Sequence, residues 1–287
     1  MNRLPLFARR CLSTTAIRRS KPKPFHIAFA ELTDVSPSKC VATITMSCAK
    51  ANSFDATALQ GLSQALAQVE ARPDVRGLVL QSGVAGFFSA GFSLPVFSSI
   101  SHADFKQLWA LARDVFRRLH ALPVPSIAAI DGHALGLGCA LAMACQHRYA
   151  VRSSALIGLN EVVVGLPVPQ WLAERFRDLT SLRAAEELLS TGATLSIDRA
   201  LPLGLIDAIF DSSDAVAAAA HTRLHQCAAA PHFAQAETLE ALRRPFLARF
   251  DADCEHDTEQ LWRAISSSHT QHAIQAAIAR LASKRAP

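Results

Sequence analysis

The sequence predicts an α/β fold, in which short apolar strands alternate with amphipathic helices. The first observation behind this is the alternation itself, which runs over residues 25–210 with turn residues between the apolar segments. The second is the Ala-rich, helix-like composition of residues 213–287. The third is size: 287 residues, 50% of them hydrophobic, can bury one large core or two smaller ones. No run of 18 consecutive apolar residues occurs, so no transmembrane helix is predicted.

The first half of the chain alternates predicted strands and helices. Residues 25–46 alternate in the manner of strands, most clearly in the segment CVATITM at 40–46. Asp55 can cap a helix that carries leucine and valine at helical spacing, and RGLVLQS at 76–82 is typical of a short buried strand. A helix over about 102–120 is indicated by its apolar face, which comprises Phe105, Leu108, Trp109, Ala112, Phe116 and Leu119.

The second half begins with strands at 125–131 and 147–151, which flank a Gly-containing turn and an Ala-rich helix over about 137–145. A helix that Gly192 closes and a last strand at 204–210 follow. In the helical remainder, Pro245 is predicted to break or kink one helix. The final helix has an apolar stripe that can pack on its own core or on another subunit, and the stripe comprises Ile274, Ile278 and Leu281.

The positive charge is concentrated at the N-terminus. The formal net charge is +5, yet residues 1–24 hold seven basic side chains and no acidic one, which leaves 22 basic and 24 acidic residues in the rest. An acid-free, Arg-containing, amphipathic segment is typical of a mitochondrial transit peptide, and a basic tail without targeting function is the alternative. The folded part has no basic excess, so we predict no nucleic-acid binding.

Cysteine and histidine give no sign of a metal site. The seven cysteines are odd in number and form no C-x-x-C pair, which favours free thiols in a reducing compartment. His221 and His225 are spaced four residues apart on a helix, but no acidic residue close by completes a ligand set. We therefore expect no metal.

Glu161 is the only charged residue between Arg152 and Glu174. Burying an unpaired carboxylate among valine, leucine and isoleucine is unfavourable unless the group is protonated or finds a partner. Glu161 can be a structural acid with a hidden hydrogen-bond partner, a residue on an exposed loop, or a catalytic base whose pKa its apolar surroundings raise.

Two segments with small residues follow predicted strands, GFFSAGFSL at 86–94 and IDGHALGLGCALAM at 130–143. Where a strand leads into a helix, the first N–H groups of the helix have no intrahelical partner and lie at the positive end of its dipole. Such turns can stabilise an anion or a developing oxyanion, although either segment alone can equally be a tight turn.

Three motifs in order resemble the crotonase superfamily, also called the enoyl-CoA hydratase/isomerase family. They are FSAGFSL (88–94), PSIAAIDGHALGLGCALAMACQHRYA (125–150) and IGLNEVVVGL (157–166). The resemblance covers about residues 25–210. It implies a ClpP/crotonase-like fold of repeated ββα units, with a transit peptide at 1–24, a core at 25–200 and a C-terminal region at 201–287 that holds a strand and trimerisation helices. It also implies an acyl-CoA substrate and homotrimers, sometimes paired into hexamers.

The resemblance further implies an oxyanion hole of two backbone N–H groups, which by position belong to Ala90 and Leu137. Family members usually have glycine in place of Leu137, and aspartate in place of Ser93, where serine can still cap a helix. Residues expected at the substrate are Ser89, Gly91, Phe92 and Ser93 in one loop, Ala51 and Ser53 in the KANSF segment at 50–54, and Asn160 beside the acid.

Hydratases of this family carry two glutamates, and the first has its counterpart at Ala140 here. One carboxylate, Glu161, is enough to move a proton from C2 to C4 of an acyl-CoA. Together with the flanking IGLNE and VPQWL segments, this resembles the mitochondrial Δ3,Δ2-enoyl-CoA isomerases of fatty-acid β-oxidation, enzymes of the matrix that need no metal or redox cofactor. An enoyl-CoA hydratase-like enzyme and a non-catalytic acyl-CoA-binding protein remain the alternatives.

Overall fold

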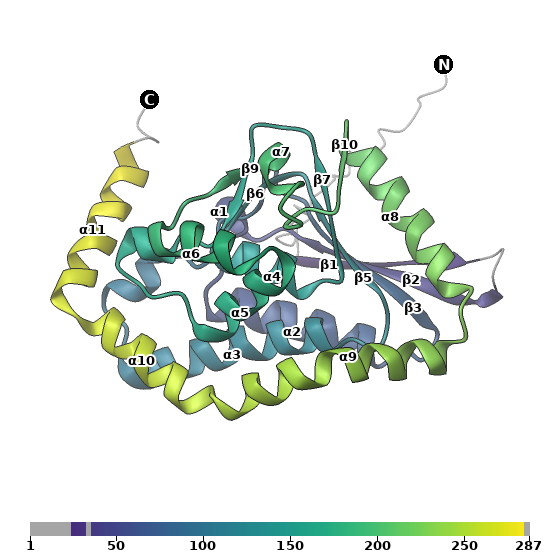
Figure 1. The fold of residues 1–287 in the computed structure, drawn as a ribbon, viewed down its shortest axis with the longest axis horizontal. Coiled ribbons are helices and arrows are strands. Elements are labelled where there is room, and N and C mark those ends of the chain that lie inside the picture. The colour runs from purple at the N-terminus through teal and green to yellow at the C-terminus, as the bar shows by residue number, and fades with distance from the viewer. Residues whose placement is uncertain (1–23, 33–35, 284–287) are drawn as a thin grey trace, which may run out of the picture.

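The computed structural model describes residues 24–32 and 36–283, so the predicted transit peptide lies outside the described residues apart from Pro24. A twisted six-stranded sheet is the main element of the fold (Figure 1). Its order is β1-β2-β3-β5-β7-β10, and every neighbouring pair is parallel except β1 and β2. The strands are β1 (Phe25–Leu32), β2 (Ser36–Met46), β3 (Val75–Ser82), β5 (Ser126–Ile130), β7 (His147–Val151) and β10 (Ala208–Phe210). The strands predicted at 76–82, 125–131 and 147–151 are confirmed as β3, β5 and β7.

A second sheet of four short strands has the order β4-β6-β8-β9. Its members are β4 (Gly86–Ser89), β6 (Gly132–Leu135), β8 (Leu156–Gly158) and β9 (Leu195–Ser196). We expected turns or loops at 86–94 and 130–136, and that expectation was wrong for β4 and β6. Strands of two to four residues that contain glycine have too few apolar side chains to produce a recognisable period. Neighbouring backbones pair them, since β4 lies parallel to β6 and β6 to β8.

The two sheets arise from a repeated unit. A strand of the large sheet is followed by a strand of the small sheet and then by a helix, as in β3-β4-α3 and β5-β6-α4. This is the expected ββα repeat. The helices are α1 (Ala49–Asn52), α2 (Ala56–Glu70), α3 (His102–Ala121), α4 (Leu137–Ala144), α5 (Gln170–Leu179), α6 (Leu182–Thr191), α7 (Ile197–Ala200), α8 (Ser213–Ala228), α9 (His232–Ala252), α10 (Cys254–Ser266) and α11 (Ser268–Ser283), with short 3₁₀ helices η1 (Leu94–Ser98) and η2 (Glu161–Val164).

The ends of the predicted helices follow the expected local chemistry. The Asp55 carboxylate accepts a hydrogen bond from the N–H of Ala58 at 2.8 Å and so caps α2. Gly192 ends α6 in the left-handed conformation, with φ at 66°. Ser93 differs: it precedes η1, but its side chain makes no capping hydrogen bond, so the predicted cap was wrong. The turn is closed instead by the backbone, through the Val96 N–H and the Ser93 carbonyl.

Helices cover both faces of the large sheet. On one face, α8 packs Val216, Ala220 and Leu224 against strand residues such as Val79 and Ile127. The other face forms the main core with α2, α3 and α4, and the long α9 runs beneath α2 and α3 (Figure 1). The predicted apolar face of α3 is confirmed, since all six of its residues are at most 5% exposed.

Pro245 lies inside α9 and does not break it. An internal proline removes a backbone donor and costs about 3 kcal/mol. Phe246 and Phe250, the residue after the proline and one a turn further on, are buried against Phe116 of α3. Their burial offsets the lost hydrogen bond and holds the helix continuous.

The apolar stripe of α11 is divided between core and solvent. Ile274 is fully buried and Ile278 packs against the core, whereas Leu281 is 53% exposed. Ile274 and Ile278 therefore pack on the protein's own core, as one of the two interpretations predicted. Leu281 is available for the other predicted role, a contact with another subunit.

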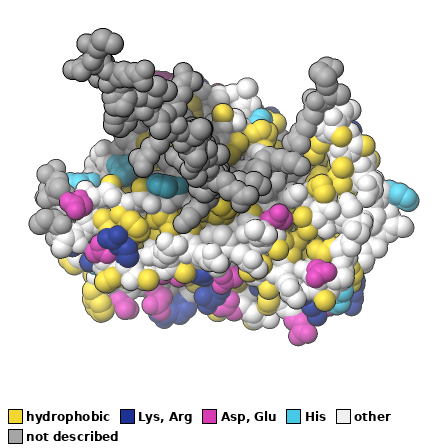
Figure 2. Space-filling view, turned by 180° about the vertical axis from the view of Figure 1, so that it is seen from behind, with side chains coloured by type: hydrophobic (Ala, Val, Ile, Leu, Met, Phe, Trp, Pro, Cys, Tyr) yellow, Lys and Arg dark blue, Asp and Glu magenta, His cyan; other side chains and the backbone are white. Residues whose placement is uncertain are grey.

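The surface shows no accumulation of one charge along the lower edge in Figure 2, where acidic and basic side chains are interspersed. Surface ion pairs of the described chain include Arg118–Glu70 and Arg117–Asp251. Among the described residues, no helix is both long and apolar enough to cross a membrane.

Candidate active site

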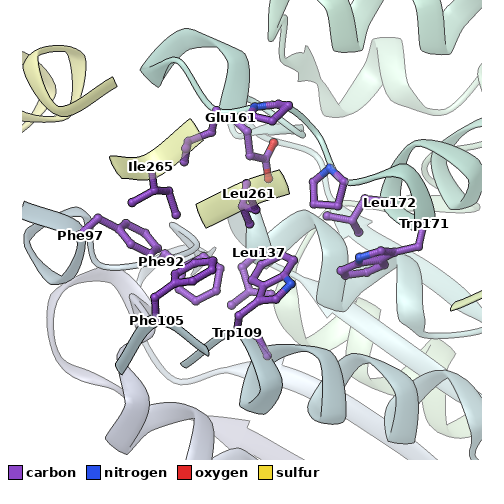
Figure 3. Close-up of a pocket in the computed structure, with 14 residues that line it drawn as sticks. Phe92, Phe97, Phe105, Trp109, Leu137, Glu161, Trp171, Leu172, Leu261 and Ile265 are labelled. Atoms are coloured by element: carbon purple, nitrogen blue, oxygen red, sulfur yellow. The ribbon is translucent and has the colours of Figure 1, made fainter. Parts of the chain in front are cut away.

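An apolar cavity lies between α3, α5, η2 and α10 (Figure 3). Its empty space, including the open mouth, is about 490 Å³. Five aromatic rings line it, from Phe92, Phe97, Phe105, Trp109 and Trp171. The other lining residues are Ala112, Leu137, Glu161, Leu166, Pro167, Pro169, Leu172, Leu261 and Ile265. Glu161 is the one charged residue among these described residues.

Glu161 begins η2, directly after the small sheet ends at β8. Its carboxylate points into the cavity in Figure 3. Within the described chain, its Oε2 atom is buried and has no hydrogen-bond partner. Burial raises the pKa of Glu161 from 4.5 to about 7 because the apolar walls disfavour the charged form. The unpartnered Oε2 does not fit a structural acid with a hidden partner, and the burial of that atom does not fit an exposed loop, so the catalytic base stays as the prediction.

Gly136 brings the carboxylate close to the start of α4. Its φ and ψ of 52° and −121° are accessible almost only to glycine, and its N–H donates to the carbonyl of Gly158 at 3.0 Å. A methyl group placed on Gly136 would lie 3.5 Å from Oε1 of Glu161 and 3.6 Å from Oδ1 of Asn160. The acid therefore lies against the turn whose next residue, Leu137, begins the helix.

The loop after β4 lies directly against the same turn. A methyl group on Gly91 would stand 3.1 Å from the nitrogen of Leu137, and one on Gly138 would collide with the carbonyl oxygen of Ser89 at 2.4 Å. Close approach of two backbones requires glycine at both contacts. The two segments singled out in the sequence thus meet beside Glu161.

The structure changes which N–H group of the first segment can serve an oxyanion. The N–H of Ala90 donates to the carbonyl of Ala51 at 3.0 Å, so this donor is already used and the assignment to Ala90 conflicts with the structure. Among the described residues, the N–H of Phe92 and the N–H of Leu137 donate to no other group. Both residues line the cavity, so Phe92 and Leu137 form the better pair.

Ser89 and Ala51, both expected at the substrate, also make hydrogen bonds within the protein. Ser89 is fully buried, and its hydroxyl donates to the Asn52 carbonyl at 2.8 Å and accepts from the Gly91 N–H at 3.0 Å. Ala51 has a positive φ of 69° and supplies the carbonyl that Ala90 binds. Ser53, Ser93 and Asn160 are partly exposed and do not line the cavity.

Asn52 is the residue of this region that the sequence did not reveal. It is fully buried, and its Oδ1 accepts from the Cys48 N–H at 2.7 Å. Its Nδ2 group donates to Met46 O, Ser82 Oγ and Phe88 O at 2.8–3.2 Å. Its φ of 49° is a conformation that asparagine tolerates better than most residues. Asn52 therefore joins β2, β3 and β4 behind the loop that carries Phe92.

The remaining polar residues of the two segments do not enter the cavity. His133 is part of β6, where its Nδ1 accepts from the N–H of Leu156 at 3.0 Å. Cys139 and Ala140 are fully buried in α4. Across residues 24–32 and 36–283, no three His, Cys, Asp or Glu side chains lie close enough together to hold a metal ion.

The arrangement of an apolar cavity, a carboxylate with a raised pKa and two free N–H groups can be compared with known families. A family model described as Enoyl-CoA hydratase/isomerase matches residues 37–284. The chain belongs to the enoyl-CoA hydratase/isomerase family. The sequence resemblance is thereby confirmed, and the fold is the crotonase fold.

Individual relatives carry different activities in their names. Human mitochondrial enoyl-CoA delta isomerase 1 is 28% identical over 231 residues, which are 80% of this chain and 76% of that protein. The bovine mitochondrial enoyl-CoA hydratase domain-containing protein 2 is 37% identical over 172 residues, 60% of this chain and 58% of that one. Among solved structures, human mitochondrial delta3-delta2-enoyl-CoA isomerase has a TM-score of 0.85 at 25% identity, covering 92% of this chain and all of that one.

Proposed function

We propose that this family member is a Δ3,Δ2-enoyl-CoA isomerase, which converts a 3-enoyl-CoA into the 2-trans-enoyl-CoA. The observation that carries the proposal is the solitary Glu161 carboxylate, which lies in an apolar cavity beside two unpartnered N–H groups and has a pKa of about 7. A general base works best when its pKa lies near the working pH. The structural similarity to a human enzyme named as this isomerase, with a TM-score of 0.85, supports the same proposal.

The chemistry uses the site in two steps. The Glu161 carboxylate takes a proton from C2 of the 3-enoyl thioester, and the electron pair moves into the thioester carbonyl to give a dienolate. The N–H groups of Phe92 and Leu137 then donate to the enolate oxygen, and one such donor is worth about 3 kcal/mol in the transition state. The protonated Glu161 returns the proton to C4, the double bond now lies between C2 and C3, and the carboxylate is restored. No metal or redox cofactor takes part in this scheme.

Among the described residues that line the cavity, Glu161 is the only carboxylate, which favours isomerisation over hydration. Adding water to a 2-enoyl-CoA requires one group to orient the water and another to deliver a proton, and two carboxylates share these tasks in the family's hydratases. Here the position of the first is Ala140, a fully buried residue without an ionisable group. Hydration is the second candidate because one relative is named as an enoyl-CoA hydratase domain-containing protein.

Location and assembly follow from the same proposal. The mitochondrial relatives and the basic N-terminal segment support action in the mitochondrial matrix, in the β-oxidation of unsaturated fatty acids. We further propose a homotrimer in which the C-terminal helices contribute to the contacts, with a pair of trimers as the alternative. Light scattering on the purified protein distinguishes a monomer, a trimer and a hexamer.

The test is an ultraviolet assay for the conjugated 2-enoyl thioester after addition of 3-hexenoyl-CoA. The wild type is expected to form it, and Glu161→Gln to lower kcat by about 10²–10⁴-fold because the base is lost. The exposed Glu187→Gln serves as the matched control and should retain full activity. Equal activity of Glu161→Gln and wild type would disprove the role of Glu161. Rapid loss of 2-hexenoyl-CoA absorbance would instead identify a hydratase, and binding without either reaction a non-catalytic acyl-CoA protein.

A further inference from the structure

The two tryptophans of the cavity wall are held by one carboxylate. Trp109 belongs to α3 and Trp171 to α5, and the indole N–H of each donates to the same Oδ2 atom of Asp257 at 3.1 Å. Asp257 lies on α10 and is 3% exposed. A buried indole N–H needs an acceptor, so this single oxygen determines how both rings are oriented.

Arg113 completes the cluster from the next turn of α3. Its Nη1 lies 2.7 Å from the same oxygen of Asp257, and its Nη2 donates to the backbone carbonyl of Phe250. Its guanidinium also stacks 4.0 Å from the centre of the Phe250 ring. Arg113 is 4% exposed, so the two opposite charges compensate each other away from water.

The cluster stands behind the cavity wall. Both tryptophans line the cavity, whereas Asp257 and Arg113 do not. Both indole N–H groups therefore donate to a carboxylate that lies outside the cavity lining. Asp257 also shares one side of α10 with Leu261 and Ile265, four and eight residues further on, and both of these line the cavity. One ionic contact thus fixes walls contributed by three helices.

We propose that Asp257 is a specificity-determining positioning residue, which holds Trp109 and Trp171 in place and thereby limits the length of the acyl chain that the cavity accepts. The inference rests on the proposed function in that the ligand is an acyl-CoA. Binding becomes more favourable with each methylene group that an apolar chain buries. A longer chain is therefore excluded only where a rigid wall closes the cavity. Two bulky rings with their polar atoms tied to a buried ion pair make such a wall.

The experiment compares a short and a long substrate in three variants. Trp171→Phe keeps an aromatic ring but removes the N–H and reduces the volume, and Asp257→Asn keeps the shape and one acceptor oxygen but removes the charge. Asp251→Asn is the matched control, because Asp251 pairs with Arg117 between α9 and α3 on the surface, away from the cavity. For each variant, kcat/KM is measured with 3-hexenoyl-CoA and 3-dodecenoyl-CoA, and Kd with hexanoyl-CoA and dodecanoyl-CoA.

Two ratios are compared with wild type: long-chain over short-chain kcat/KM, and long-chain over short-chain affinity. Both should rise by about tenfold in Trp171→Phe and Asp257→Asn, and both should stay unchanged in Asp251→Asn. A general loss of structure lowers both chain lengths alike and leaves the ratio constant. A constant ratio in folded Trp171→Phe and Asp257→Asn overturns the inference. If the protein isomerises nothing but its affinity ratio shifts as stated, the isomerase proposal fails while the inference stands.

Discussion

Replacing Glu161 with glutamine should change the pH dependence of folding by an amount that the structure fixes. In the unfolded chain this carboxyl has its ordinary pKa of 4.5, and in the folded protein burial raises the pKa to about 7. Each unit of difference between the two pKa values corresponds to about 1.36 kcal/mol of unfolding free energy. At a pH above about 7, Glu161 therefore lowers the stability of the wild type by about 3 kcal/mol.

The sign follows from which state releases its proton first. Below about pH 4 both states hold the proton and Glu161 contributes no pH dependence. As pH rises from 4.5 to about 7, the unfolded chain ionises while the folded one stays protonated, so folding becomes less favourable. Above pH 7 the folded carboxyl ionises as well and the loss is complete. Glutamine does not titrate, so the Glu161→Gln variant lacks this pH-dependent loss of stability.

The assay is urea unfolding of wild type and Glu161→Gln at several pH values between about 4 and 8, at one protein concentration because oligomers unfold in a concentration-dependent way. The buried glutamine amide lacks a partner and lowers the stability of the variant at every pH. The informative quantity is therefore how the difference in unfolding free energy between variant and wild type changes with pH. That difference should shift in favour of the variant by about 3 kcal/mol across the range. Parallel pH curves would refute the raised pKa and with it the argument for a poised base.

Three further predictions concern the backbone around the site. Gly136→Ala forces a residue with a side chain into a φ of 52°, which should cost about 1–3 kcal/mol of backbone strain. The variant should show a lower kcat/KM while its circular dichroism spectrum stays unchanged. Asn52→Ala removes the acceptor of the buried Cys48 N–H and a donor to the Phe88 carbonyl, and should lower the free energy of unfolding by about 3 kcal/mol in urea titrations; an unchanged midpoint would contradict the role given to Asn52. An amide-to-ester exchange that removes the Phe92 N–H should reduce kcat by about 10²–10³-fold, whereas the same exchange at Ala90 should mainly cost about 1 kcal/mol of stability.

Strong local patterns accounted for much of the fold. The strands β3 and β5 contain the apolar runs LVL (78–80) and IAAI (127–130), and the apolar face of α3 repeats from Phe105 to Leu119, so their positions could be predicted to within a residue or two. The small sheet could not be predicted, because β4, β6, β8 and β9 have two to four residues each and exist only through pairing with one another. Pro245 shows the same limit, since the burial of its neighbours decides that α9 continues.

The sequence by itself determined the α/β class, the family and the position of the solitary acid, because periodicity, motif order and the lack of charge near Glu161 are properties of the chain in one dimension. Only the tertiary structure decided which backbone donors are free: the Ala90 N–H is taken by Ala51, and this depends on a pairing between distant segments. It likewise decided that Trp109 and Trp171 line a cavity and share Asp257. Helical spacing places such rings on the inner face, but whether that face meets side chains or empty space depends on the helices packed against it.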